Sequence, residues 1–171
     1  MRGSPRGGPQ GRASEALKVV FRRALPEHLQ DLLFKLQQSC PFFESMKDGE
    51  VAEFLRMCRA ESYGAGALVF ERGDPAGCMY VIMSGRVSIV PGDARKREAR
   101  LGPGEAFGEM ALIDGAPRSA SVWTLEPSVL LAASAEVLEA RVPLLQAKVM
   151  KNIARQIARH LREADAFIDS R

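Results

Sequence analysis

The most informative part of the sequence is residues 107–122, which read FGEMALIDGAPRSASV. Gly108 precedes a short apolar run at residues 109–113, and Gly115 follows that run. Glycine tolerates the left-handed backbone found where one element ends and another begins, so the run is predicted to be a single helical turn between two strands. Pro117 has a fixed φ angle and stiffens the entry into the second strand.

This segment has the residues of an anion site. A helical turn that begins after Gly108 presents backbone N–H groups that have no helical partner. Arg118, at the start of the next strand, adds a planar guanidinium that can bond two phosphate oxygens at once. Because a carboxylate repels phosphate, Glu109 is better suited to accept hydrogen bonds from a neighbouring hydroxyl pair, as a ribose offers. An ordinary helix start, in which Arg118 pairs with Glu109 or Asp114, also fits these residues and stays open.

Residues 61–133 have the spacing of a small β-roll or barrel. Glycines at positions 64, 66, 73, 77, 85, 92, 102 and 104 separate short apolar runs. The runs predicted to be strands are residues 67–70, 79–83, 87–90 and 129–133. Short strands with turn signals at this interval are typical of such folds.

Helical patterns flank the predicted strands. Residues 15–60 are predicted to be helices, and the last of these is expected to have Asp48 as its N-cap. Its apolar face is Val51, Phe54, Leu55 and Cys58. Within residues 134–171, Ser134 is expected to cap a short helix through Val142, and Pro143 to open a long one. The long helix carries an apolar stripe of Leu145, Val149, Ile153, Ile157, Leu161, Ala164 and Ile168.

The positive charge of the chain lies at its N-terminus. The formal net charge is +3, and Arg2, Arg6 and Arg12 account for this excess. Residues 1–14 are mainly Gly, Pro, Arg and Ser, so they are expected to form a disordered tail. The remaining residues are balanced in charge, so we expect no direct binding of nucleic acid by this chain.

The cysteines and the hydropathy favour a cytoplasmic protein. Cys40, Cys58 and Cys78 are odd in number and have no metal-ligand spacing, so they are predicted to be buried, reduced thiols. The apolar runs are much shorter than the ~20 residues that cross a bilayer, and no signal peptide is recognisable, so no membrane partner is expected.

Residues 107–122 resemble the phosphate-binding cassette of the cyclic nucleotide-binding domain family, which includes catabolite activator proteins and protein kinase A regulatory subunits. The shared pattern is F-G-E, a small apolar helix, and then an arginine followed by a small residue and Ala. Residues 73–85 also resemble the glycine-bounded hairpin of that family, and the likeness covers roughly residues 40–165. The resemblance implies an α+β fold, in which an antiparallel β-roll (a double-stranded β-helix jelly roll) is flanked by N-terminal helices and a long C-terminal helix.

The resemblance also implies the ligand-binding residues. These would be Phe107, Gly108, Glu109, Met110, Ala111, Arg118, Ser119 and Ala120. Arg118 would bind the cyclic phosphate, and Glu109 the ribose 2′-hydroxyl. Backbone N–H groups near Gly108, Glu109, Met110 and Ala120 would complete the phosphate cradle, and Ser119 would contact phosphate or a guanine base.

The C-terminal helix departs from the family pattern. Catabolite activators offer hydroxyl residues to the adenine there, whereas this chain has Ala164 and Asp165, and His160 replaces an arginine one turn earlier. Recognition of the base, and so the choice between cAMP and cGMP, therefore stays open, and of the two we expect cAMP. The helix is predicted to relay binding to an output, and its stripe fits either packing on the roll or a homodimer seam.

Functions of other classes fit the sequence less well. A metal-dependent barrel enzyme needs several histidines inside the barrel, but the chain has only His28 and His160, both in helical segments, so no enzyme activity and no metal are expected. The alternatives that stay open are a ligand-independent protein-interaction module and the sensor half of a truncated transcription regulator.

Overall fold

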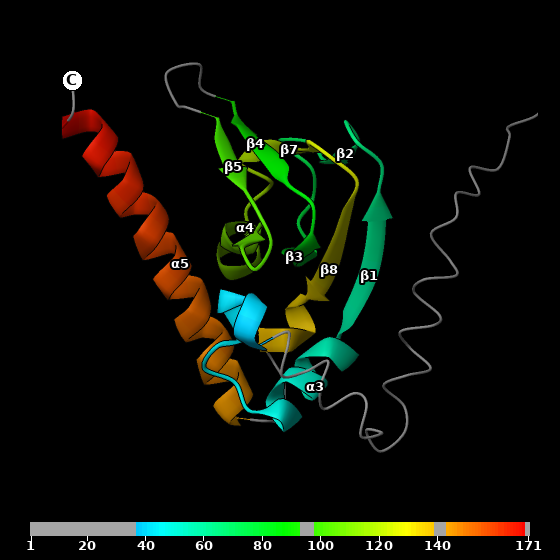
Figure 1. Cartoon of the computed structure of the whole chain (residues 1–171). Helices are drawn as coiled ribbons and strands as arrows, with labels where there is room; N and C mark the ends of the chain where they lie inside the picture. The colour runs from blue at the N-terminus through cyan, green and yellow to red at the C-terminus, as the bar shows by residue number, and fades with distance from the viewer. Residues whose placement is uncertain (1–36, 93–97, 139–142, 170–171) are drawn as a thin grey trace, which may run out of the picture.

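The computed structural model describes residues 37–92, 98–138 and 143–169, and two four-stranded antiparallel sheets form its centre (Figure 1). The first sheet has the order β1-β8-β3-β6, made of Cys58–Tyr63, Ser128–Ser134, Cys78–Ser84 and Ala106–Phe107. The second has the order β2-β7-β4-β5, made of Leu68–Phe70, Ala120–Thr124, Val87–Pro91 and Ala99–Leu101. The four strands predicted from apolar runs are therefore present as β2, β3, β4 and β8.

Helices flank the roll as the sequence predicted. The 3₁₀ helix η1 (Pro41–Phe43) and α3 (Asp48–Arg56) precede it, and η2 (Ala135–Leu138) and α5 (Pro143–Asp169) follow it. The short helix α4 (Glu109–Asp114) lies between β6 and β7, and α5 runs along that side of the molecule (Figure 1). The predicted fold class is confirmed. Among the described residues, no helix is long and apolar enough to cross a bilayer.

The first sheet separates two apolar clusters because its side chains alternate between its faces. Met79 and Val81 of β3 pack against the helices, together with Phe43, Phe54, Leu131, Leu145, Val149 and Ile153. Tyr80 and Ile82 point instead to the interior of the roll, where they meet Val87, Leu101, Phe107, Val122 and Leu130. The candidate functional site lies at the edge of this second cluster.

The predictions for α3 need two corrections. Its N-cap is Lys47, and Asp48 is the first helical residue, because the Glu50 carboxylate accepts a hydrogen bond from the Lys47 N–H at 2.7 Å. Cys58 belongs to β1 and not to the apolar face of the helix, since the helix ends at Arg56.

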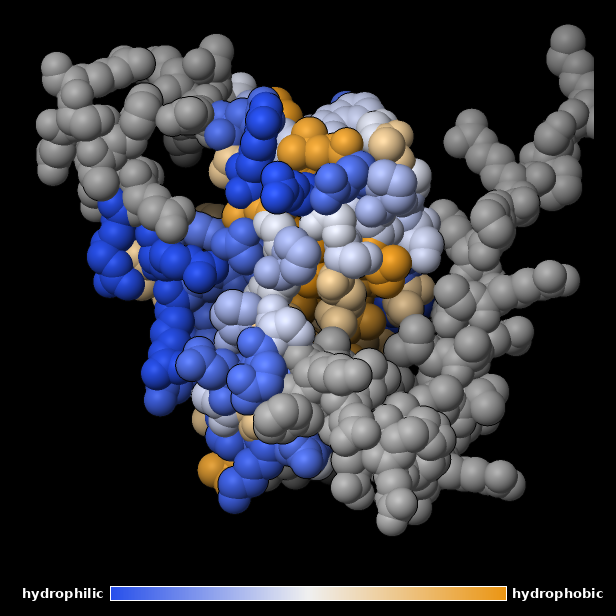
Figure 2. Space-filling model, viewed as in Figure 1, coloured by the Kyte–Doolittle hydropathy of each residue, from blue (hydrophilic) through white to orange (hydrophobic). Residues whose placement is uncertain are grey.

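The C-terminal stripe is buried along only part of its length. Leu145, Val149 and Ile153 are buried, whereas Leu161 is 59% exposed. Hydrophilic side chains gather over the outer side of α5 (Figure 2). Ser134 ends β8 and leads into η2, while the rest of the short helix predicted to reach Val142 lies outside the described residues.

Some of the predicted features fall on residues outside the described part of the chain. These are the tail at residues 1–14, the helical segment at 15–36 and the side chains of Ala164 and Ile168.

The cysteines are free but not equally buried. Cys40 is buried, and burial raises its pKa to about 11. Burial also raises the pKa of Cys58, so both thiols stay protonated at neutral pH. Cys58 and Cys78 are only half-buried as whole residues, which corrects the prediction that all three thiols are buried, and Cys78 contacts Arg118.

Candidate functional site

The predicted helical turn is present where the sequence placed it. β6 ends at Phe107, Gly108 has a φ of +76°, and α4 begins at Glu109. A Cβ atom at position 108 would lie 2.5 Å from Nη1 of Arg118, so this position needs glycine both for its backbone angle and for space. Gly115, with a φ of +68°, follows α4 as predicted.

Arg118 lies inside the protein and reaches back to the start of this turn. Its side chain is 5% exposed. Nη1 donates to the carbonyl oxygen of Gly108 at 2.9 Å, and Nη2 donates to the carbonyl oxygen of Cys78 at 2.7 Å. The guanidinium also lies over the ring of Phe70, 4.1 Å from its centroid.

This buried cation has no carboxylate partner among the described residues. Neither Glu109 nor Asp114 forms an ion pair with it, and Asp114 instead accepts a hydrogen bond from the Ala116 N–H at 2.9 Å. The Nε atom of Arg118 is buried and has no hydrogen-bond partner within the described ranges. A buried charge without a counter-ion is costly, so the arrangement favours an anion that would complete it.

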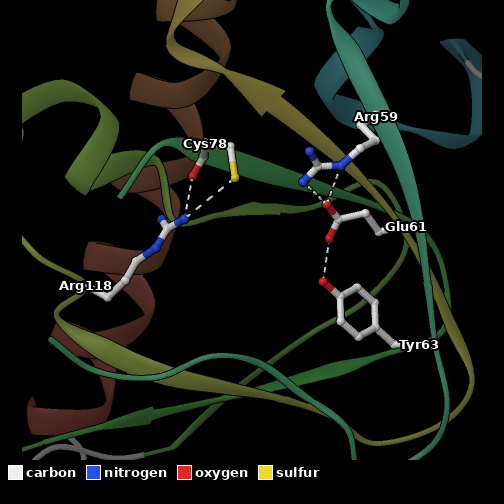
Figure 3. A network of polar contacts seen from close by, with 5 residues as sticks. All are labelled: Arg59, Glu61, Tyr63, Cys78 and Arg118. Carbon is white, nitrogen blue, oxygen red and sulfur yellow. Dashed lines mark hydrogen bonds and ion pairs between the residues drawn. The ribbon is translucent and has the colours of Figure 1, made fainter. Parts of the chain in front are cut away.

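The acidic residue of β1 is neutralised by its own neighbours. Glu61 accepts hydrogen bonds from Nε of Arg59 at 2.8 Å and from the Tyr63 hydroxyl at 2.5 Å. Figure 3 shows this group on β1 and, separate from it, Arg118 bonded to Cys78. Glu61 therefore does not serve as the counter-ion of Arg118.

Aromatic rings form a platform beneath Arg118 that the sequence analysis missed. Tyr80 and Phe107 stack with centroids 5.2 Å apart, and Phe70 stacks on Tyr80 at 5.9 Å. These residues come from three strands that are distant in sequence, so no local pattern indicated that they meet.

A cavity of about 190 Å³ lies between α4, the roll and α5. Its walls include every predicted site residue except Ala111, whose side chain lies outside the described part of the structure. The lining residues are Phe70, Ile89, Leu101, Ala106, Phe107, Gly108, Glu109, Met110, Arg118, Ser119, Ala120, Val122 and His160. The cavity thus combines an apolar interior with a cation at its wall, as small-molecule sites commonly do.

Glu109 stands in the same wall and has no ion-pair partner in the described part of the chain. Burial raises its pKa, and the nearby charges of His160 and Arg118 offset part of this effect. A half-buried carboxylate of this kind can accept hydrogen bonds from a ligand.

His160 also lines the cavity; the sequence analysis noted it as a departure from the family on the C-terminal helix but did not place it among the ligand-binding residues. Its Nε2 is buried, has no hydrogen-bond partner among the residues that the structure describes, and lies 3.8 Å from Oε1 of Glu105. Arg159 approaches the same oxygen at 3.0 Å, and His160 is the largest cause of the lowered pKa of Glu105. The helical period could have indicated that His160 lines the cavity, because residues seven apart lie on the same face of a helix and position 160 follows the buried Ile153 by seven residues.

Known proteins are similar to this chain in sequence and in fold. Residues 60–142 match the family model of the cyclic nucleotide-binding domain. The cyclic AMP receptor protein of Thermus thermophilus is 38% identical over 75% of this chain, which covers 61% of that protein. The Drosophila melanogaster cAMP-dependent protein kinase type II regulatory subunit is 32% identical over 68% of this chain, which covers 30% of it. The crystal structure of the T. thermophilus catabolite activator protein superposes with a TM-score of 0.64 and 37% identity, over 75% of this chain and 62% of that one.

Proposed function

We propose that this chain, whose residues 60–142 belong to the cyclic nucleotide-binding domain family, binds a 3′,5′-cyclic nucleotide in the cavity beside α4 and does no chemistry on it. The chain spans about three fifths of the length of the T. thermophilus receptor protein and less of the kinase subunit. Any activity of the full-length receptor or kinase subunit is therefore carried over to this chain only as a proposal.

The observation that carries the proposal is the unpartnered Nε of Arg118. This atom belongs to a buried cation that lines the cavity and lacks a carboxylate partner among the described residues. The phosphate of a cyclic nucleotide is a monoanion with two free oxygens, and a guanidinium matches that geometry. Binding would thus supply the missing counter-charge.

The remaining contacts follow from the positions of the lining residues. Glu109 would accept a hydrogen bond from the ribose 2′-hydroxyl, and the apolar interior beside Phe107 would hold the sugar and base. Backbone N–H groups at Gly108, Met110 and Ala120 would add to the phosphate contacts. Ser119 is exposed and lines the cavity, so its hydroxyl is available to phosphate or base.

We favour cAMP over cGMP as the ligand. The support is the 38% identity to a protein named as a cyclic AMP receptor. His160 is the residue of α5 that lines the cavity, and an imidazole can bond to either purine, so it does not by itself choose between them.

The output would pass through α5. This helix contacts both the residues before the roll and the cavity wall, and its exposed Leu161 offers part of a homodimer seam. The similarity to the T. thermophilus receptor also favours a place as the sensor part of a transcription regulator. A protein-interaction module that binds no ligand is the alternative.

Isothermal titration of the folded, nucleotide-free chain with cAMP, and separately with cGMP, tests the proposal. Binding at micromolar concentration or tighter is expected, and the ratio of the two constants identifies the base. Absence of heat with both nucleotides, confirmed by equilibrium dialysis, would favour the interaction module. Sedimentation of the same sample with and without ligand tests the homodimer.

A further inference from the structure

The strand that leads into the cassette lies at the edge of its sheet. β6 is the last strand in the order β1-β8-β3-β6, and it pairs with β3 through Ala106 and Phe107. An edge strand leaves one row of backbone N–H and C=O groups without a strand partner. Ala106 is 2% exposed, so water does not readily satisfy these groups.

The side chain of Gln156, on α5, makes the hydrogen bonds to Ala106 that a neighbouring strand would otherwise make. Its Oε1 accepts a hydrogen bond from the Ala106 N–H at 3.0 Å, and its Nε2 donates to the Ala106 carbonyl oxygen. Gln156 is 7% exposed, so both hydrogen bonds are shielded from water. A carboxamide has one acceptor and one donor group at the spacing of a peptide unit, which is why it can satisfy both groups of Ala106.

The residue before Ala106 is also held by α5. Oε1 of Glu105 forms an ion pair with Nη2 of Arg159 at 3.0 Å, and the same oxygen lies 3.8 Å from Nε2 of His160. Two consecutive residues of the roll are therefore fixed to α5, directly before Phe107 and Gly108 of the cavity wall.

A second buried amide on the same helix makes a different connection. Asn152 lies one turn before Gln156 and is 6% exposed. Its Nδ2 donates to the carbonyl oxygen of Phe42 at 2.6 Å, and its Oδ1 accepts from the Ser45 hydroxyl at 3.0 Å. Asn152 thus resembles Gln156 in burial and in number of hydrogen bonds, but it fastens α5 to the segment before the roll.

We propose that Gln156 is a positioning residue that ties α5 to the strand entering the cassette, so that occupation of the cavity and the position of α5 depend on each other. This inference rests on the proposed function. A ligand that bonds to the turn after Phe107 would act on a strand whose outer edge is bonded to the helix. Ligand binding and the position of α5 are coupled only if the chain has two arrangements that differ in their affinity for the ligand. In this proposal, β6 is the element that connects the cavity to α5.

The test compares the complete chain with Gln156→Met and Asn152→Leu, two replacements of similar volume that each remove one buried amide. The cAMP affinity, the urea unfolding curve and the amide exchange of residues 105–110 and of α5 are measured with and without cAMP. In Gln156→Met we expect an affinity loss of about tenfold, faster exchange of the β6 amides and loss of the cAMP-induced change in α5. In Asn152→Leu we expect an affinity within about twofold of the parent at a similar loss of stability.

Gln156→Glu adds a readout that a purely structural role would not give. An ionised carboxylate can accept from the Ala106 N–H but cannot donate to its carbonyl oxygen, whereas the protonated acid can do both. The affinity of this variant, relative to the parent at each pH, should therefore recover as the pH is lowered.

The inference would be overturned if Gln156→Met binds cAMP as tightly as the parent and shows the same cAMP-induced change in α5. It would also be overturned if Asn152→Leu loses as much cAMP affinity as Gln156→Met. If Gln156→Met does not fold, a Gln156→Glu affinity ratio that stays level with pH overturns it. If the parent binds neither cAMP nor cGMP, the proposed function fails, and the exchange of the Ala106 amide in ligand-free Gln156→Met still tests the tie to α5.

Discussion

Nη1 of Arg118 donates to the carbonyl oxygen of Gly108 at 2.9 Å, so the cation that faces the cavity is fastened to the glycine that starts the helical turn. Arg118 also leaves no room for a side chain at position 108, because a Cβ atom there would lie 2.5 Å from Nη1 of Arg118. The turn and the cation therefore depend on each other, and substitutions at the two positions separate their contributions.

Replacing Arg118 by alanine should weaken cyclic nucleotide binding by about 2–5 kcal/mol, or roughly 30-fold to several thousand-fold, because the phosphate loses its charged partner. The ligand-free chain should also lose stability, because the carbonyl oxygens of Gly108 and Cys78 lose their donor, although no carboxylate among the described residues is left unpaired. Titration calorimetry and urea unfolding measure the two effects. Arg100→Ala is the control, because Arg100 is exposed and pairs only with Glu98 in the described part of the chain. Parental affinity in Arg118→Ala would show that the phosphate binds elsewhere.

Replacing Gly108 by alanine should lower both stability and nucleotide affinity. The left-handed backbone alone costs a residue with a Cβ about 1–2 kcal/mol, and overlap with Arg118 adds to it. Gly115→Ala is a matched control, since Gly115 has a φ of +68° but no described atom within 4 Å of the place a Cβ would take, so it should bear the backbone cost alone. The two unfolding free energies, measured in urea, should differ. Equal values would mean that Arg118 moves aside without cost.

The sequence predicted the elements that have a local signal. Short apolar runs indicated β2, β3, β4 and β8, and Gly108 and Gly115 indicated the bounds of α4. β1 was missed because its sequence CRAESY is mostly polar, and β6 because two residues carry no periodicity.

The parts of the site that were missed all depend on contacts between distant residues. Gln156 bonds to a residue 50 positions earlier, and nothing near either position indicates the pairing. His160 was visible as a histidine on a helix, but its approach to the cavity depends on how α5 crosses the roll. The pairing of Arg118 with backbone carbonyls rather than with Glu109 likewise follows from packing and not from spacing.

Replacing Glu109 by glutamine should stabilise the ligand-free chain at neutral pH and weaken its binding to cAMP. Burial raises the pKa of Glu109 in the folded state, so the folded chain holds its proton longer than the unfolded chain does. Its contribution to stability therefore falls as the pH rises from the ordinary carboxyl pKa through the raised one, and glutamine removes that loss. Urea unfolding at several pH values gives the first effect, and titration with cAMP gives the second.

A 2′-deoxy analogue of cAMP separates the ribose contact from other effects of Glu109→Gln. The parent should bind the analogue more weakly than cAMP, whereas the variant should distinguish the two ligands less. Equal binding of both ligands by the parent would contradict the ribose role of Glu109.

Replacing Glu105 by glutamine should make the stability of the chain less dependent on pH in the acid range. Its folded-state pKa is lowered, chiefly by His160, with contributions from the Gly102 N–H and Arg159. The stability it contributes is present above the ordinary carboxyl pKa and is lost as the pH falls through the lowered value. The difference in unfolding free energy between parent and variant should therefore shrink on going from about pH 7 to about pH 3. Glu126→Gln is the control, because Glu126 is exposed and has no ion pair among the described residues. The difference in unfolding free energy between this variant and the parent should not change with pH. If Glu105→Gln is as stable as the parent at neutral pH, the ion pair with Arg159 does not hold α5 to the roll, and Gln156 makes that connection without it.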